Sequence, residues 1–306
     1  HIQFHSGAKI FVLKDCDRLT VLNVHDLGAS DYFARPLDGN ALIPVIREAV
    51  NRKAEAGWNT LSQTQRAALR VSLKCFENSF QNVHQGEPLS AEEIKETAQQ
   101  VLQATASGQL DSWMDALRGH HSYTFRHSMF VCGVVSAFAQ AIGIGSIDTE
   151  ILIQGALLHD IGKARVPLEI LDKPSALTEV EWNVMRAHPE YSRDLMQGQG
   201  ELDPRIVSMA VHHHERLDGD GYPDGLCGAA IDDHVRLISI GDVYSALVDK
   251  RAYKPPLEKE QAISIMKESK GQLDLKLIAA FSEFILDGDS GVLIRDQQPP
   301  RLKRPA

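Results

Sequence analysis

Histidine residues gather in the middle of this sequence, beside carboxylates and glycines. Nine of the 13 histidines lie between positions 120 and 234. Three of them, at positions 212–214, are contiguous and precede Glu215 and a glycine-rich turn that ends at Pro223. Contiguous imidazoles are poor core residues, and their usual role in proteins is to bind a metal ion. This stretch therefore predicts a metal site.

A second stretch pairs an imidazole with a carboxylate. His159 and Asp160 follow the apolar run 151–158 and precede Lys163. Adjacent helical residues point about 100° apart, so this pair could bind two neighbouring ions or one ion from two sides. Asp242 lies inside another apolar stretch, where an unpaired charge is unfavourable. A metal ion or an arginine would explain Asp242, and a buried salt bridge is the simpler explanation for that residue alone.

Seven residues of this kind lie inside or at the ends of expected buried helices. The candidate metal ligands are His127, His159, Asp160, His188, His213, His214 and Asp242. Nitrogen and oxygen ligands without thiolate favour iron, manganese, nickel or zinc. Seven ligands are too many for one tetrahedral ion and suit two ions, which lie about 3.5–4 Å apart in hydrolytic sites. Two such ions would lower the pKa of a bridging water and so supply hydroxide for a hydrolytic reaction at neutral pH.

The elements that must position these ligands are almost all helices. Between residues 100 and 290 the apolar spacing predicts helices over 128–142, 151–158, 178–188, 204–211, 235–247, 261–266 and 276–286. Four or more helices can direct side chains at one interior site. We therefore expect a mainly α catalytic domain over residues 100–290, with the ligands in its centre.

The segment 1–53 has a different pattern and resembles part of a response-regulator receiver domain. Residues 9–13 and 28–36 have the pattern of short strands, and 41–53 that of a helix. The pair Arg35-Pro36 stands where that family has Lys-Pro. Only the second half of a receiver would be present. We expect a small α/β segment with a structural or dimerising role, without regulation by phosphorylation.

Residues 54–99 are expected to form a helical linker. Apolar residues recur there at helical spacing. Ser90 and Glu93 predict a capping box at the start of a second helix, in which each side chain bonds the backbone of the other. These N-terminal helices could form a homodimer interface or pack on the following domain, and the sequence favours neither.

Composition limits the class of protein. The chain has 306 residues, of which 43% are hydrophobic, as in ordinary globular proteins. It has no apolar run near the roughly 20 residues of a membrane span, no signal peptide, and four cysteines too far apart for a disulfide frame. We therefore expect a cytoplasmic protein with reduced thiols.

The net charge of −9 argues against nucleic acid as a partner. Residues 291–306 are basic and predict a disordered tail.

Two motifs resemble a known family. His159-Asp160 with Lys163 is similar to the signature of the HD superfamily of metal-dependent phosphohydrolases. The stretch from His213 to Pro223, with its Gly-Tyr-Pro turn, resembles the signature of the HD-GYP subfamily, and the similarity covers roughly residues 65–290. The resemblance implies a helical phosphodiesterase that converts cyclic di-GMP to pGpG, and onward to GMP in some members. It also implies a centre of two or three metal ions, often iron or manganese.

The same resemblance implies roles for individual residues. The seven candidates named above would be the ligands, with Asp160 as the bridging carboxylate. Lys163 would lie near the scissile phosphate and could protonate the leaving oxygen. Arg251 and Lys254 would bind substrate phosphates. Tyr222 would stack on a guanine, pack the loop, or present the loop to a partner such as a diguanylate cyclase.

Three positions depart from the family pattern. Tyr123 stands where trinuclear members have a glutamate ligand, which favours two ions here. Ser245 and Ala252 replace residues that are usual in the segment after Asp242, and both could alter substrate fit. Three hypotheses stay open: an active cyclic di-GMP phosphodiesterase, a weakly active scaffold that binds nucleotide or a partner, and a phosphodiesterase for cyclic GMP-AMP.

Overall fold

The computed structural model describes most of the chain. The described residues are 2–3, 9–14, 17–29, 31–35, 51–52, 54–106, 110–120, 122–173, 175–197, 199, 201–249, 256–269 and 271–286. Arg251, Lys254 and Ala252 lie outside the described residues, as do most of the helix expected at 41–53 and the tail at 291–306.

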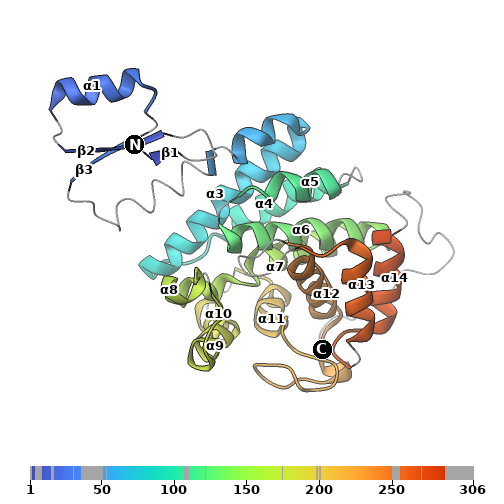
Figure 1. Ribbon diagram of the computed structural model, residues 1–306. Helices are drawn as coiled ribbons and strands as arrows, with labels where there is room; N and C mark the ends of the chain where they lie inside the picture. Colours follow the sequence, from blue (N-terminus) through green and yellow to red (C-terminus); the bar gives the residue numbers. More distant parts are fainter. Residues whose placement is uncertain are drawn as a thin grey trace.

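A small α/β segment precedes the helices (Figure 1, blue). Strand β2 (Lys9–Leu13) pairs antiparallel with β1 (Ile2–Gln3) and parallel with β3 (Asp31–Ala34). A parallel pair needs a crossover connection, and α1 (Arg18–Asp26) lies in that connection. The two expected strands are confirmed, although β3 is shorter than expected. Helix α1 was not anticipated from the sequence. The relation to a receiver domain stays a prediction.

The rest of the described chain is helical, which confirms the expected mainly α class. Its elements are η1 (Trp58–Thr60), α3 (Gln63–Gln85), α4 (Ala91–Thr105), α5 (Leu110–Leu117), α6 (Tyr123–Ala141), α7 (Ser146–Leu158), η2 (Ile161–Arg165), α8 (Leu168–Leu171), α9 (Glu179–Arg186), α10 (His188–Met196), α11 (Pro204–His212), η3 (Gly228–Ala230), α12 (Asp233–Val248), α13 (Lys259–Glu268) and α14 (Leu275–Leu286). Among the described residues, no helix combines the length and apolar character that a membrane span requires.

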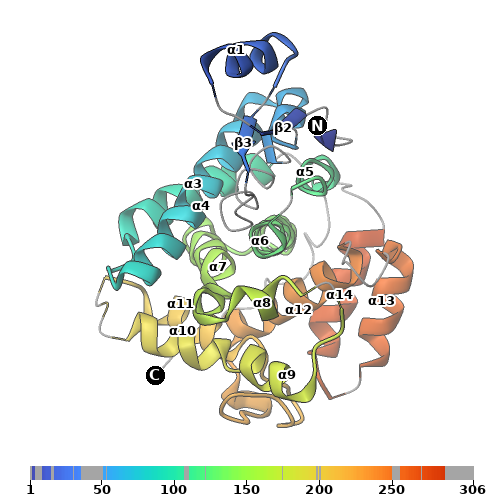
Figure 2. The ribbon, with the colours of Figure 1, turned by 60° about the vertical axis from the view of Figure 1, so that its left-hand side comes forward.

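Helix α6 is the centre of this helical body. Its residues from Thr124 to Ala139 are all buried. A helix that is buried on every face must be covered on every face, and α4, α5, α7 and α12 pack around it. Figure 2 looks nearly along the axis of α6, with the other helices arranged around it.

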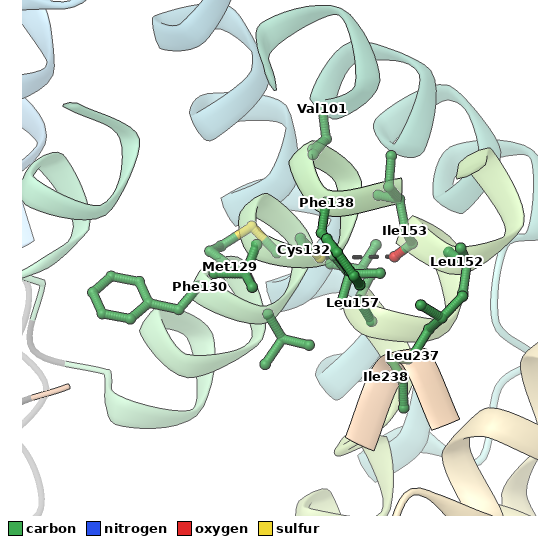
Figure 3. Close-up of a cluster of buried hydrophobic side chains, with 14 of the residues drawn as sticks. Val101, Met129, Phe130, Cys132, Phe138, Leu152, Ile153, Leu157, Leu237 and Ile238 are labelled. Carbon is green, nitrogen blue, oxygen red and sulfur yellow. Dashed lines mark hydrogen bonds between the residues drawn. The ribbon is translucent and has the colours of Figure 1, made fainter. Parts of the chain in front are cut away.

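The core joins α6 to α7 by close apolar packing (Figure 3). Phe138 and Leu157 are almost completely buried, and each such side chain contributes about 1.5–3 kcal/mol by leaving water. Cys132 on α6 also donates a weak hydrogen bond to the carbonyl of Ile153 on α7, at 3.7 Å. This packing fixes the C-terminal end of α7, from which His159 and Asp160 follow.

Helices α3 and α4 belong to the same core. They pack against each other, and α4 also packs on α6 and α7. The Ser90 side chain accepts from the backbone N–H of Glu93 at 3.2 Å, as expected of an N-cap. The expected return bond from Glu93 is wrong, because that carboxylate accepts from the side-chain amide of Asn78 on α3 at 2.8 Å. The contact between α3 and α4 thus replaces half of the predicted capping box.

The helices that follow α7 form a chain of neighbours that surrounds the candidate ligands. Segment η2 packs on α10, α10 on α11, and α11 on α7 and α12. Helix α9 has a complete capping box, in which Thr178 and Glu181 each bond the backbone of the other. Pro189 lies in the first turn of α10, where a proline needs no N–H partner.

Candidate metal centre

All seven candidate ligands approach one another, although they come from several helices. His127 lies on α6, His159 and Asp160 follow α7, His188 begins α10, His213 and His214 follow α11, and Asp242 lies within α12. Six of them are buried, and His214 is partly buried. Helix packing therefore collects in one place the residues that the sequence separates by more than 100 positions.

Three of the imidazoles are held in one orientation by their own helices. The Nδ1 atom of His159 lies 2.7 Å from the carbonyl of Ala156, and that of His188 lies 2.7 Å from the carbonyl of Met185. His213 repeats this bond to the carbonyl of the third residue before it, at 3.1 Å. Because a carbonyl only accepts, Nδ1 must donate, and each Nε2 keeps a lone pair directed into the site.

These lone pairs face one another without a donor between them. His188 Nε2 and His213 Nε2 are 3.3 Å apart, and His159 Nε2 is buried without a hydrogen-bond partner in the described structure. Two acceptors at this distance repel each other unless a cation lies between them. Buried unsatisfied nitrogen atoms of this kind are suited to bind a cation. The donor set therefore fits divalent metal ions.

The ligand atoms form three overlapping groups, each with its atoms within 4.8 Å of one another. The groups are His188 with His213 and His214, His127 with His159 and Asp242, and His159 with Asp160 and His213. The third group links the other two. Asp160 lies 3.3 Å from His159 Nε2 through one oxygen and 3.2 Å from His188 Nε2 through the other. A carboxylate so placed could bridge two ions, and the bridging role of Asp160 stays a prediction.

The charge states of His213, His214 and Asp160 suit metal binding. Burial lowers the pKa of His213 well below its usual value and lowers that of His214 to about 3, so both imidazoles are neutral at neutral pH. Burial alone would lower the pKa of His159 too, but the nearby Asp160 carboxylate outweighs burial, and the pKa of His159 is raised. For Asp160 itself, Lys163 and His159 overcome the effect of burial and hold the pKa well below its usual range. The carboxylate is therefore ionised.

Lys163 lies beside the centre, with Nζ 2.5 Å from Asp160 Oδ2 and its side chain 14% exposed. It is therefore not an ordinary solvated lysine. The turn that brings it there requires Gly162, because a Cβ at that position would lie 2.0 Å from the carbonyl oxygen of His188. The Gly162 N–H donates to Ser192 Oγ at 3.0 Å, which attaches the turn to α10.

The loop after His214 is held by a buried carboxylate that was not among the expected site residues. Glu215 is 3% exposed and accepts from the backbone N–H groups of Asp224 and Leu226, at 2.7 and 3.0 Å. A Cβ on Gly221 would lie 2.4 Å from the backbone nitrogen of Arg216, so the loop can close only with glycine there. The signal for this role in the sequence was an acidic residue directly after two candidate ligands.

His120, His212 and His234 were not expected to be ligands, and they lie outside the centre. His212 turns away from the centre and contacts Asp224 through Nε2 at 3.0 Å. His120 is buried against Phe125, with ring centres 4.7 Å apart. His234 is buried on α12, where burial lowers its pKa. Tyr123 stacks on the candidate ligand His127, with ring centres 5.7 Å apart.

A pocket of about 290 Å³ opens beside the centre. Its lining residues are Arg186, His213, His214, Glu215, Arg216, Asp220, Tyr222, Ser239, Asp242, Val243, Gln272 and Leu273. The Tyr222 ring lies 4.9 Å from that of His214. Burial raises the pKa of the Tyr222 hydroxyl, and the nearby Arg186 guanidinium opposes that rise. Metal ligands and polar side chains thus share one cavity.

These features agree with a match to a known protein family. Residues 111–277 match the HD domain family, and the chain belongs to that family. A solved HDG"Y"P protein from Bdellovibrio bacteriovorus has a similar fold, with a TM-score of 0.59 and 20% sequence identity over 80% of each chain.

Several curated relatives are cyclic dinucleotide phosphodiesterases by name. A cyclic di-GMP phosphodiesterase of Pseudomonas aeruginosa is 34% identical over 58% of this chain and 43% of its own length. The cyclic di-GMP phosphodiesterase response regulator RpfG of Xanthomonas campestris is 37% identical over 46% of this chain and 37% of its own. The 3'3'-cGAMP-specific phosphodiesterase 1 of Vibrio cholerae is 40% identical over 50% of this chain and 36% of its own. The chain thus spans less than half the length of these relatives.

Proposed function

We propose that this protein is a metal-dependent phosphodiesterase that hydrolyses cyclic di-GMP to pGpG, and pGpG onward to GMP. The observation that carries the proposal is the convergence of two groups of three ligands on the Asp160 carboxylate, beside a pocket lined by Tyr222 and Arg186. Two relatives with that activity in their names are 34% and 37% identical to this chain, over 58% and 46% of its length.

Two divalent ions fit the ligand groups. His188, His213 and His214 would hold one ion, His127, His159 and Asp242 the other, and Asp160 would bind both. Iron or manganese is our first expectation, with nickel or zinc as alternatives, because the donors are nitrogen and oxygen. When bound, such ions supply a water-derived nucleophile at neutral pH and neutralise charge on a phosphodiester.

The side chains of the protein have complementary tasks in this proposal. Lys163 balances the charge of Asp160 and places an ammonium group where negative charge develops on the scissile phosphate. It is also a proton donor for the leaving oxygen. Tyr222 provides an aromatic wall for a guanine. Arg251 and Lys254 are proposed to bind substrate phosphates.

Turnover of cyclic di-GMP by the full chain tests this function. The protein is loaded with Fe²⁺ or Mn²⁺, and products are separated by chromatography. We expect pGpG to appear first and GMP later. An Asp160→Asn variant serves as the inactive control. Absence of turnover by the wild-type protein with either metal would reject the proposal, and retained nucleotide binding without turnover would favour a scaffold role.

A second candidate substrate is cyclic GMP-AMP, because a relative specific for 3'3'-cGAMP is 40% identical to the matched part of this chain. Competition between the two nucleotides in one reaction decides between them. We expect a higher kcat/KM for cyclic di-GMP, and the reverse order would assign the protein to the other substrate. Binding of a diguanylate cyclase at the Gly-Tyr-Pro loop, a homodimer through the N-terminal helices and a cytoplasmic location stay predictions.

A further inference from the structure

Two arginines line the pocket beside the metal centre, and they differ in their partners. Arg216 is held by Asp218 through two contacts, Nε to Oδ1 at 3.0 Å and Nη2 to Oδ2 at 2.7 Å. Arg186 makes no hydrogen bond or ion pair with the part of the chain that the structure describes. Its guanidinium lies over the Trp182 ring, 5.9 Å from the ring centre. One of the two cations is therefore committed, and the other is available to a ligand.

Arg186 comes from a different part of the chain than the other residues that line the pocket. Arg186 is the last residue of α9, whereas the other lining residues come from the stretches 213–222, 239–243 and 272–273. Trp182 lies one turn earlier on the same face of α9, and its side chain is 45% exposed. The stacked indole restricts the guanidinium without neutralising its charge. Helix α9 thus contributes an oriented cation to the pocket that Tyr222 also lines.

A cyclic dinucleotide needs more than one anion-binding position. It carries two phosphodiesters on opposite sides of its ring, and the metal centre with Lys163 can engage one of them at a time. The other phosphodiester stays charged and must be balanced when the substrate leaves water. A planar guanidinium can donate two parallel hydrogen bonds to such a phosphate.

We propose that Arg186, supported by Trp182, binds the phosphodiester that is not being cleaved, and so makes the site selective for substrates with two linked phosphates. This inference rests on the proposed function, since it names a second contact for the same substrate. Arg186 is a binding residue for the distal phosphate and takes no part in bond cleavage.

Two probes separate this role from a role at the metal centre. The first is cyclic di-GMP, whose binding to the metal-free full chain is measured by calorimetry and whose KM is measured with metal present. The second is bis(p-nitrophenyl) phosphate, a diester with a single phosphate, hydrolysed by the metal-loaded protein. The variants are Arg186→Gln and Arg186→Lys. Arg118→Gln is the matched control, because it removes one exposed arginine charge that does not line the pocket.

We expect Arg186→Gln to raise the Kd and KM for cyclic di-GMP about 10- to 100-fold, which is the range for a lost charged hydrogen-bond pair. Arg186→Lys should lie between Gln and wild type. Hydrolysis of bis(p-nitrophenyl) phosphate should be unchanged in both variants, and Arg118→Gln should match wild type throughout.

Three results would overturn the inference. Wild-type Kd and KM in Arg186→Gln would show that the side chain does not contact the substrate. An equal loss on both probes would place its effect at the metal centre. Absence of cyclic di-GMP binding by the wild-type protein would remove the ligand itself. Arg186-dependent binding without turnover would support the inference and reject the proposed hydrolysis. Turnover by the wild-type protein, together with unchanged cyclic di-GMP binding in Arg186→Gln, would support the proposed hydrolysis and reject the inference.

Discussion

Neighbouring histidines in one sequence motif have different environments, and this difference predicts different losses on substitution. His213 directs Nε2 into the ligand cluster, whereas His212 contacts Asp224 outside it. We expect His213→Ala to lose at least one metal ion per chain and to lower phosphodiesterase activity by at least about 100-fold, since a ligand should matter at least as much as its outer partners. His212→Ala should retain both ions. Elemental analysis by mass spectrometry measures the difference, and equal metal contents in the two variants would contradict the assignment.

Gly162 predicts a severe packing effect for a small change. An added Cβ would lie 2.0 Å from His188 O and 2.7 Å from Ser192 N, and neither backbone atom can move without shifting α10. We expect Gly162→Ala to lower the free energy of unfolding by about 1–3 kcal/mol or more, since overpacking typically costs this much. Gly57→Ala is the control, because nothing lies within 4 Å of its added Cβ. Urea unfolding compares the two, and equal midpoints would refute the prediction.

The end of α12 is joined to the start of α6 by a buried ion pair. Arg126 Nε lies 2.9 and 3.0 Å from the two carboxylate oxygens of Asp249, and Arg126 Nη1 donates to the carbonyl of His120 at 2.7 Å. Both residues are buried. Asp249→Ala leaves a buried guanidinium without this carboxylate and should lower the free energy of unfolding by about 3–5 kcal/mol.

An exposed pair provides the control for that experiment. Asp115 pairs with Arg118 at 3.0 Å, but both side chains are largely in water. Asp115→Ala should change the free energy of unfolding by less than about 1 kcal/mol. If Asp249→Ala were equally mild in urea unfolding, the buried pair would not be what joins α6 and α12.

The start of α9 predicts a pH dependence. Hydrogen bonds from Lys173 and Thr178 lower the pKa of Glu181 from 4.5 to about 2. A lowered pKa means that the ionised carboxylate stabilises the folded helix above pH 4.5, and that this contribution is lost as the pH falls from 4.5 toward 2. We expect Glu181→Ala to increase amide hydrogen exchange in α9 at pH 7.

The difference between Glu181→Ala and wild type should shrink below pH 4.5, after correction for intrinsic exchange rates. Glu181→Gln keeps a capping acceptor without the charge and should lie between the two. A difference that stayed constant between pH 7 and pH 3 would contradict the prediction. Because Arg186 ends the same helix, Glu181→Ala should also weaken cyclic di-GMP binding.

At the scale of the whole molecule, thiol reactivity should report the integrity of the core. Cys75 and Cys132 are completely buried, and burial raises the pKa of Cys75 to about 11 and raises that of Cys132 further. Cys227 lies exposed in the loop after the Gly-Tyr-Pro turn. Iodoacetamide at pH 7.5 should therefore modify Cys227 in the native protein, and Cys75 and Cys132 only after unfolding. Peptide mapping by mass spectrometry measures the modification of each cysteine, with protein unfolded in about 8 M urea as the reference. Rapid native labelling of Cys75 would contradict the packing of α3 and α4.

Much of the fold and of the metal centre could be predicted from the sequence. The helices at 151–158 and 204–211 were expected within a few residues of their observed bounds, because their apolar spacing is a local property. The seven candidate ligands were expected to meet, because four or more buried helices can direct their side chains at one interior site. Helix α1 was missed, because its apolar residues form no strong stripe.

Other contacts could not be predicted, because they join distant parts of the chain. The pair Arg126–Asp249 spans 123 positions, and nothing in the local pattern of either residue indicates the other. Glu93 was expected to cap its own helix, but the packing of α3 on α4 offers it the Asn78 amide instead. Arg186 lay within the helix expected at 178–188 and was given no role, since its place on the pocket wall depends on where α9 packs.

The sequence by itself determined which residues would be buried at the metal centre and which helices would present them. Its apolar periodicity sets the buried face of each helix, and its motifs place imidazoles and carboxylates at the ends of those faces. Only the tertiary structure decided which ligands form a group, which arginine is free to meet a substrate and where the pocket opens. The physical reason is that burial specifies that a face must be covered, whereas the shape of the whole core decides what covers it.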